Sequence, residues 1–221
     1  MTKAQLKRII LTNIPTYDVT DENCENLYYK AKSNGIGRIL VGPASLEAIK
    51  GFEGRGLKAG VSIAYPSGAV TPELKVAEMH DCEAESSMID MFFVTCAQGF
   101  YTSGHDDNLV KEMTECVKAT EKPVYFIIEL MELTDAKLEF LVETAKKAGV
   151  KGLLLSTAFR PYDVIKDPDS KRIRKIKKLA GNDLEIIAAG RNMKTEEAAL
   201  AAMRAGASSV LINVNDKVFG V

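Results

Sequence analysis

The sequence predicts an α/β protein with a (β/α)8 fold, a TIM barrel. Short runs of aliphatic and β-branched residues alternate along the chain with longer amphipathic stretches, which is the pattern of repeated strand–helix units. Most of the short runs are apolar on both faces, as a parallel sheet covered by helices requires. Eight such runs favour a closed barrel over an open sheet. We therefore expect one barrel domain over residues 1–221.

The predicted strands follow one another at residues 8–13, 37–41, 60–65, 88–94, 124–130, 152–156, 184–189 and 209–213. Threonines mark the starts of several intervening helices, because a threonine hydroxyl can accept a hydrogen bond from a free N–H of the first turn. These are Thr20, Thr71, Thr134 and Thr195. Gly149 is typical of a helix end. Only residues 214–221 follow the last strand, and only 216–221 remain for a further element, so the final outer helix is expected to be short or missing.

Composition narrows the classes of function. The net charge is −1, whereas surfaces that bind nucleic acid or anionic membranes need an excess of basic residues. No apolar run approaches the ~20 residues that span a bilayer, and the N-terminus lacks the apolar stretch of a signal peptide. The four cysteines are widely spaced and form no CxxC pair, which indicates reduced thiols in a cytoplasmic protein. The expected partner is a small-molecule substrate.

A motif at residues 65–78, YPSGAVTPELKVAE, has the form F-P-x-G-x-x-T-x-E-x-K-x-x-E except for its first residue. This segment closely resembles the deoxyribose-phosphate aldolase family. Weaker matches follow in the family's order: IDM at 89–91, IIE at 127–129, LTD at 133–135, a gapless stretch at 148–159 and AGA at 205–207. The resemblance runs through most of the chain. It implies a class I aldolase barrel, a lyase of carbohydrate metabolism and a homodimer.

The departures from the family fall where its chemistry should be. In the gapless alignment, the family's Schiff-base lysine falls on Leu154, and its second lysine, which tunes the first, falls on Ile187. The family's acidic residue after the first strand falls on Leu11, and the glycine that ends its last strand falls on Leu211. The sequence therefore predicts a divergent member that cannot form the family's imine.

No other group replaces that lysine in the sequence pattern. Lys151 lies three residues before Leu154, so the alternation of strand side chains turns it to the other face. Lys194 and Lys217 lie near the expected active end, but outside the strand walls where burial can lower an amine's pKa. A metal-dependent aldolase usually needs several imidazoles, and this chain has two histidines. We therefore expect no cofactor and no metal.

Two carboxylates are candidate catalytic groups. Asp90 and Glu129 lie on consecutive predicted strands, and we expect both at the carboxyl ends of those strands, where barrel active sites lie. One carboxyl group of such a pair can act as a general acid and the other as a general base if their environments give them different pKa values. Alternatively, a carboxylate at this place only accepts hydrogen bonds from loop amides or, in the case of Glu129, closes a structural ion pair. Ser156 and Thr157 end a strand, so their hydroxyls bind ligand oxygen or cap the following loop.

A second group of candidate substrate-binding residues follows strands six to eight, where barrels of this kind often bind phosphate. It comprises Arg160, Gly190, Arg191, Asn192 and Asn213. An arginine can replace a glycine-rich nest with a forked grip on an anion. The alternative is an ion pair between one of these arginines and an acidic neighbour, Asp163, Asp167 or Asp216.

Two functions remain open at this point. The first is an enzyme that acts on a small sugar, sugar phosphate or oxo acid by acid–base carbonyl chemistry without an imine, with cleavage, isomerisation or epimerisation as the outcome. The second is a non-catalytic ligand-binding paralogue, because a fold alone does not imply chemistry. A polar pocket around Asp90 would favour the enzyme, and a centre filled by Leu154 and Ile187 would favour the paralogue.

Overall fold

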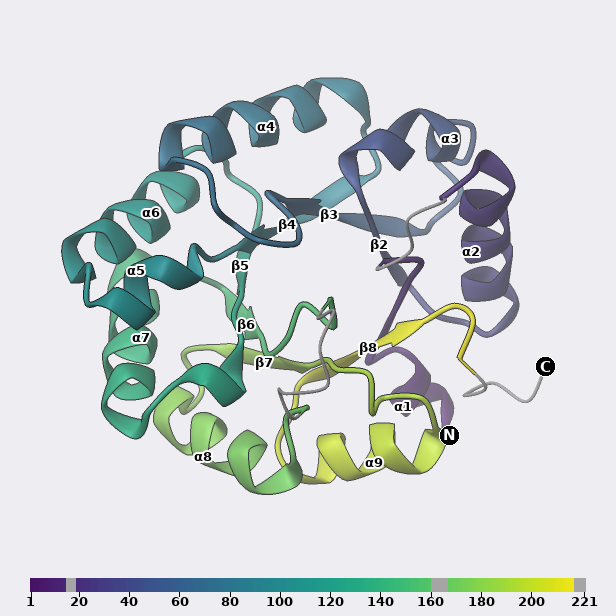
Figure 1. The fold of residues 1–221 in the computed structure, drawn as a ribbon. Helices are drawn as coiled ribbons and strands as arrows, with labels where there is room; N and C mark the ends of the chain where they lie inside the picture. The colour runs from purple at the N-terminus through teal and green to yellow at the C-terminus, as the bar shows by residue number, and fades with distance from the viewer. Residues whose placement is uncertain (15–18, 160–166, 217–221) are drawn as a thin grey trace.

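A computed structural model gives the fold of residues 1–14, 19–159 and 167–216. The strands form a closed barrel in the order β1 to β8, and every neighbouring pair is parallel (Figure 1). They are β1 (Ile9–Thr12), β2 (Arg38–Val41), β3 (Lys58–Ile63), β4 (Ile89–Thr95), β5 (Val124–Ile127), β6 (Gly152–Leu154), β7 (Glu185–Ala188) and β8 (Ser209–Asn213). The predicted (β/α)8 fold is confirmed.

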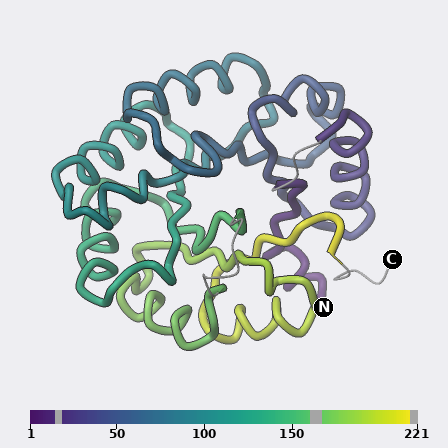
Figure 2. The backbone as a smooth tube through the Cα atoms, in the orientation of Figure 1, coloured from purple at the N-terminus to yellow at the C-terminus, as the bar shows by residue number. Residues whose placement is uncertain are grey.

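Helices form a ring outside the barrel (Figure 1). They are α1 (Lys3–Leu6), α2 (Asp21–Ser33), α3 (Leu46–Lys50), α4 (Pro72–Glu85), α5 (Gln98–Ser103), α6 (Asp106–Lys118), α7 (Asp135–Ala148), α8 (Ser170–Ala180) and α9 (Glu196–Arg204), with 3-10 turns η1 (Pro43–Ser45) and η2 (Leu130–Glu132). Figure 2 shows the chain winding around the barrel, so that β1 and β8 lie side by side. None of the helices in the described ranges has the length and apolar character needed to cross a bilayer.

The predicted helix starts are confirmed. The hydroxyls of the four threonines identified above accept hydrogen bonds from backbone N–H groups in the first turns of α2, α4, α7 and α9. Gly149 ends α7 in the left-handed conformation, as predicted. The described chain reaches Asp216 without forming a helix after β8.

The hydrophobic core has two layers. One lies between the strands and the helices, and the other fills the inside of the barrel. The inner layer consists of Ile10, Leu40, Met91, Phe93, Tyr125, Ile127, Leu154, Ile187 and Ala189. The rings of Phe93 and Tyr125 stack with centroids 5.0 Å apart. A Cβ on Gly60 would lie 2.6 Å from the Phe93 ring, so only glycine leaves room for this packing.

Candidate functional site

The centre of the barrel is apolar. Leu154 pairs in register with Ile127 on one side and with Ile187 on the other. All three side chains are almost fully buried in the inner layer. Among the described residues, the one buried lysine is Lys75, which lies on α4 outside the barrel. Of the two arrangements that the sequence left open, the structure has the filled centre. Polar groups must therefore act either at the mouth, where the carboxyl ends of the strands lie, or at the opposite rim.

The expectation that Asp90 lies at the mouth is wrong. Asp90 is the second residue of β4, and the strand continues towards the mouth as far as Thr95. The register with β3 is irregular at this point, since Ala59 pairs with Ile89 and Gly60 with Met91. The motif identified the strand correctly, but it did not fix how far the strand extends beyond the aspartate.

The surroundings of Asp90 belong to the amino-terminal rim. Burial raises the pKa of its carboxyl group above the ordinary value, while the positive charges of Arg38 and Lys58 oppose that rise. Arg38 and Lys58 are the first residues of β2 and β3. Among the described residues, no group makes a hydrogen bond to Asp90 Oδ1. These neighbours place the Asp90 carboxyl group near the rim opposite the mouth.

Glu129 does lie at the mouth, directly after β5, where η2 begins. The residue is 7% exposed, and its carboxylate accepts hydrogen bonds from the Thr157 amide at 3.0 Å, the Ser156 hydroxyl at 3.2 Å and the Thr157 hydroxyl. The predicted strand 124–130 is therefore too long, because its last residues turn into η2. Glu129 ties the end of β5 to the end of β6.

The hydroxyls of Ser156 and Thr157 also act locally. Ser156 Oγ accepts a hydrogen bond from the Ala158 amide at 3.0 Å, and Thr157 Oγ1 accepts one from the Phe159 amide at 3.1 Å. The Tyr65 hydroxyl donates to the Thr157 carbonyl at 2.7 Å. These bonds fit the alternative in which the two hydroxyls cap the loop after β6.

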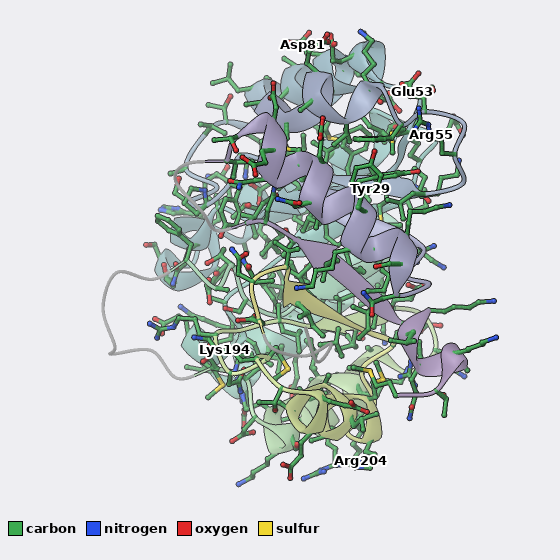
Figure 3. All side chains as sticks on the ribbon, turned by 90° about the vertical axis from the view of Figure 1, so that its right-hand side faces the viewer. Tyr29, Glu53, Arg55, Asp81, Lys194 and Arg204 are labelled. Atoms are coloured by element: carbon green, nitrogen blue, oxygen red, sulfur yellow. The ribbon has the colours of Figure 1, made fainter. Side chains whose placement is uncertain are left out.

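One hollow at the mouth lies among the ends of β1, β6, β7 and β8, with a volume of about 230 Å³. Its described lining is Thr12, Ile14, Ala158, Gly190, Arg191, Lys194, Leu211, Asn213 and Asp216, and we call it the Arg191 hollow. In the side view of Figure 3, Lys194 lies on the rim opposite Glu53 and Arg55.

Local hydrogen bonds shape the Arg191 hollow. The Arg191 amide donates to Asp167 Oδ1 at 3.0 Å, and Asn213 Nδ2 donates to the Ile14 carbonyl at 3.3 Å. A Cβ on Gly190, whose φ is 152°, would lie 2.8 Å from Asp167 Oδ1, so only glycine allows this approach. Asn192 lies beside the hollow and donates to the Pro168 carbonyl. The candidate Arg160 lies outside the described residues.

Asp216 is a functional candidate that the sequence analysis named only as a possible ion-pair partner of an arginine. It lines the Arg191 hollow, and its position shortly after the end of β8 is the only sequence feature that could have suggested it. Burial raises the pKa of its carboxyl group, and the charge of Lys194 opposes that rise. A carboxyl group with a raised pKa beside a cation can exchange protons with a bound ligand.

A second hollow, of about 290 Å³, lies among the ends of β4, β5 and β6. Its described lining is Pro66, Ser67, Thr95, Cys96, Gln98, Tyr101, Ile127, Glu129, Thr157 and Phe159, and we call it the Thr95 hollow. Burial raises the pKa of the Cys96 thiol well above its ordinary value, so this cysteine is a poor nucleophile. The described residues contain no cluster of three or more histidine, cysteine or acidic side chains that could hold a metal ion.

Comparison with known proteins places the chain in a family. The deoxyribose-phosphate aldolase of Dictyoglomus turgidum is 30% identical over 205 residues, which cover 91% of this chain and 88% of that protein. The chain belongs to the deoxyribose-phosphate aldolase family. No protein-family model matches the sequence.

Solved structures of aldolases share the fold. The aldolase QR15 superposes with a TM-score of 0.84 at 20% identity, over 97% of this chain and 92% of that one. The deoxyribose-phosphate aldolase of Aeropyrum pernix, which has a unique tetrameric structure, also has a TM-score of 0.84, at 23% identity over 95% of this chain and 87% of its own. At these identities the likeness supports the barrel and not a shared site.

Proposed function

We propose that this protein is an aldolase-family lyase of carbohydrate metabolism that works without an imine. Its substrate would be a small sugar, sugar phosphate or oxo acid, bound at the mouth of the barrel. The observation that carries the proposal is the packing of Leu154 and Ile187, which fill the centre at the positions where the family motif has its two lysines. An imine needs an amine at the reacting carbon, and this apolar layer offers none.

The Arg191 hollow supports the substrate class. Arg191 and Lys194 bring two cationic side chains to a small cavity, and Asn213 adds an amide. A guanidinium group binds phosphate or carboxylate through two parallel hydrogen bonds, which gives both affinity and orientation. A ligand with an anionic end and a carbonyl group nearby therefore suits this hollow.

Asp216 takes over the role of base that the sequence gave to Asp90. It lines the Arg191 hollow together with Lys194, and burial raises the pKa of its carboxyl group from the ordinary value towards neutral pH. In the proposed step, Asp216 removes a proton from the carbon next to the ligand's carbonyl, and Lys194 stabilises the negative charge that develops on the oxygen. Return of that proton gives isomerisation or epimerisation. For cleavage, Asp216 instead removes the proton of the hydroxyl group two carbons away from the ligand's carbonyl. The carbon–carbon bond between that carbon and the one next to the carbonyl then breaks, the hydroxyl carbon leaves as an aldehyde, and the enolate of the other fragment takes the proton back from Asp216.

Turnover of phosphorylated and free carbonyl compounds tests the proposal. Asp216→Asn is expected to lower kcat by about 10²–10⁴-fold, the usual contribution of a general base. Asp81→Asn, on an exposed face of α4, is the matched control and should leave kcat unchanged. Borohydride reduction in the presence of substrate should trap no adduct on β6 or β7. A trapped adduct inside the barrel would refute the imine-free mechanism.

A non-catalytic, ligand-binding paralogue is the second candidate. The hydrogen bonds of Glu129 favour this candidate. Glu129 is the predicted catalytic carboxylate that lies at the mouth, and it accepts hydrogen bonds from Ser156 and Thr157, which hold the loop after β6 in place. Saturable binding of phosphorylated carbonyl compounds without any turnover would decide for this candidate. The expected homodimer and the single-domain organisation remain predictions, which sedimentation and limited proteolysis would test.

A further inference from the structure

The outer helix α8 is strongly basic. Its eleven residues include six basic side chains and no acidic one. The helix lies in the ring between α7 and α9 (Figure 1), and its apolar face, with Ile173 and Ile176, is buried in the outer layer of the core. The basic side chains therefore occupy its remaining faces. They are Lys171, Arg172, Arg174, Lys175, Lys177 and Lys178.

Three of these basic residues serve the fold. Arg172 Nη1 donates to Asp135 Oδ1 at 2.9 Å, and Lys175 pairs with the same carboxylate. Because Asp135 is the first residue of α7, these contacts join the two helices. Lys177 donates to the Gly181 carbonyl, where α8 ends.

The other three basic residues form a stripe on the outside of the molecule. Lys171, Arg174 and Lys178 are exposed and follow one another at intervals of three and four residues, which places them on one face of the helix. With a rise of 1.5 Å per residue, they span about 10 Å. Within residues 1–14, 19–159 and 167–216, none of the three makes an ion pair or a side-chain hydrogen bond. We call them the α8 stripe.

The α8 stripe works against the stability of its own helix, because like charges three or four residues apart repel one another. On α3 and α6, by contrast, exposed lysines pair with carboxylates of a neighbouring helix, Lys50 with Glu85 and Lys111 with Glu73. Neither packing nor helix stability explains a row of three cations that no carboxylate meets. An external anionic partner does explain it.

The surroundings of the α8 stripe select the class of partner. Exposed carboxylates bracket it, with Asp169 at the helix start and Asp183 beyond the helix end. A nucleic acid binds through many phosphates along an extended surface, so it would run past these carboxylates. An anionic membrane would also meet them, and the buried apolar face of α8 cannot enter a bilayer. A short segment with about three carboxylates fits between the two aspartates.

We propose that the α8 stripe is a docking surface for a short acidic segment of a partner protein, in which Lys171, Arg174 and Lys178 each pair with a carboxylate. This surface goes beyond the proposed function. It lies on the outer ring of helices and uses neither the Arg191 hollow nor the Thr95 hollow.

Titration of the full chain with a labelled hexaglutamate peptide at low salt, followed by fluorescence anisotropy, tests this surface. The stripe variant, Lys171→Gln with Arg174→Gln and Lys178→Gln, should bind the peptide about 3- to 150-fold more weakly, which is the combined effect of three exposed ion pairs. Added salt should weaken binding to the wild type, because exposed charges are screened. Hexaglutamine, which lacks the carboxylates, should not bind.

A matched control variant carries the same net charge as the stripe variant. It combines Lys3→Gln, Lys7→Gln and Lys118→Gln, at exposed positions of α1 and α6, and should bind hexaglutamate as the wild type does. Urea denaturation should show the stripe variant to be at least as stable as the wild type, because the repulsion within α8 is gone. That result separates a loss of binding from a loss of fold, and lower stability would contradict the repulsion.

Three results would overturn the proposal. The first is the absence of saturable hexaglutamate binding to the wild type at low salt. The second is an equal loss of binding in the stripe variant and in the control variant, which would make the effect one of net charge. The third is tighter binding of the wild type to oligothymidylate or to phosphatidylserine vesicles than to hexaglutamate, lost in the stripe variant, which would assign the surface to another class of partner.

Discussion

Leu154 and Ile187 are register partners on β6 and β7, and both side chains are buried inside the barrel. Because Leu154 packs on all sides, Leu154→Ala should leave a cavity and lower the free energy of unfolding by about 2–5 kcal/mol. Urea denaturation measures this loss. Leu74→Ala is the control, since Leu74 is 59% exposed, and should change stability by about 0.5 kcal/mol or less. Equal losses for the two variants would contradict a packed interior.

The sequence predicted the fold well because its local features and its apolar runs agree. The threonine caps act within one helix turn, so nothing distant can override them. The predicted strand 124–130 failed at its end because Leu130 is as buried in η2 as a strand residue would be. An apolar run thus marks burial and does not mark where a strand ends.

The site was harder to predict than the fold. Asp90 was placed at the wrong rim because its depth depends on the length of β4 and on the irregular register with β3. The role of Lys75 depends on contacts with other elements, because its ammonium group donates to the Thr95 carbonyl at the end of β4 and to the Glu112 carboxylate on α6. The place of Asp216 in the Arg191 hollow depends on the closure of the barrel, which brings the end of β8 next to β1. Contacts of this kind join residues that are far apart in the sequence, so they produce no periodic pattern of apolar and polar residues in a single sequence.

The raised pKa of Asp90 predicts a dependence of stability on pH. Its ordinary value is 3.8, and burial raises the pKa in the folded state. The folded protein therefore holds this proton more tightly than the unfolded chain, so stability falls as the pH rises from about 3.8 through the folded-state pKa. Asp90→Asn removes the charge and should reduce that fall.

Urea denaturation of the wild type and of Asp90→Asn at a series of pH values from acid to neutral measures this effect. The difference in stability should move in favour of Asp90→Asn as the pH rises. Asp81→Asn, on the exposed face of α4, is the control and should show no such trend. A difference for Asp90→Asn that stays constant with pH would mean that the aspartate is not desolvated.

The buried pair of Lys75 and Glu112 predicts a coupled effect. Lys75→Met leaves the buried Glu112 carboxylate without its cation, which should lower the free energy of unfolding by about 3–5 kcal/mol. Addition of Glu112→Leu removes the remaining charge and should restore part of that loss. The exposed pair of Lys111 and Glu73 is the matched control, and Lys111→Met should have little effect on urea denaturation. Additive effects of the two buried substitutions would contradict a direct pairing.

The Arg191 hollow predicts a preference for anionic ligands that one substitution should abolish. Arg191 and Lys194 line this cavity, and Asp216 is the one acidic residue among its described lining. Arg191→Ala should weaken binding of glycerol 3-phosphate by about 1.5–3 kcal/mol, the contribution of a hydrogen bond to a charged group. Calorimetric titration measures this change. Arg204→Ala, on the exposed side of α9, is the control and should bind glycerol 3-phosphate as the wild type does.

The comparison with an uncharged ligand separates a specific anion site from a general effect of charge. Glycerol lacks the phosphate, so its binding should not respond to Arg191→Ala. Added salt should weaken glycerol 3-phosphate binding to the wild type more than to Arg191→Ala, because the substitution removes one of the attracting charges. If Arg191→Ala and Arg204→Ala weaken glycerol 3-phosphate binding equally, the anion is attracted by the surface as a whole. The Arg191 hollow would then lose its role in the proposed function.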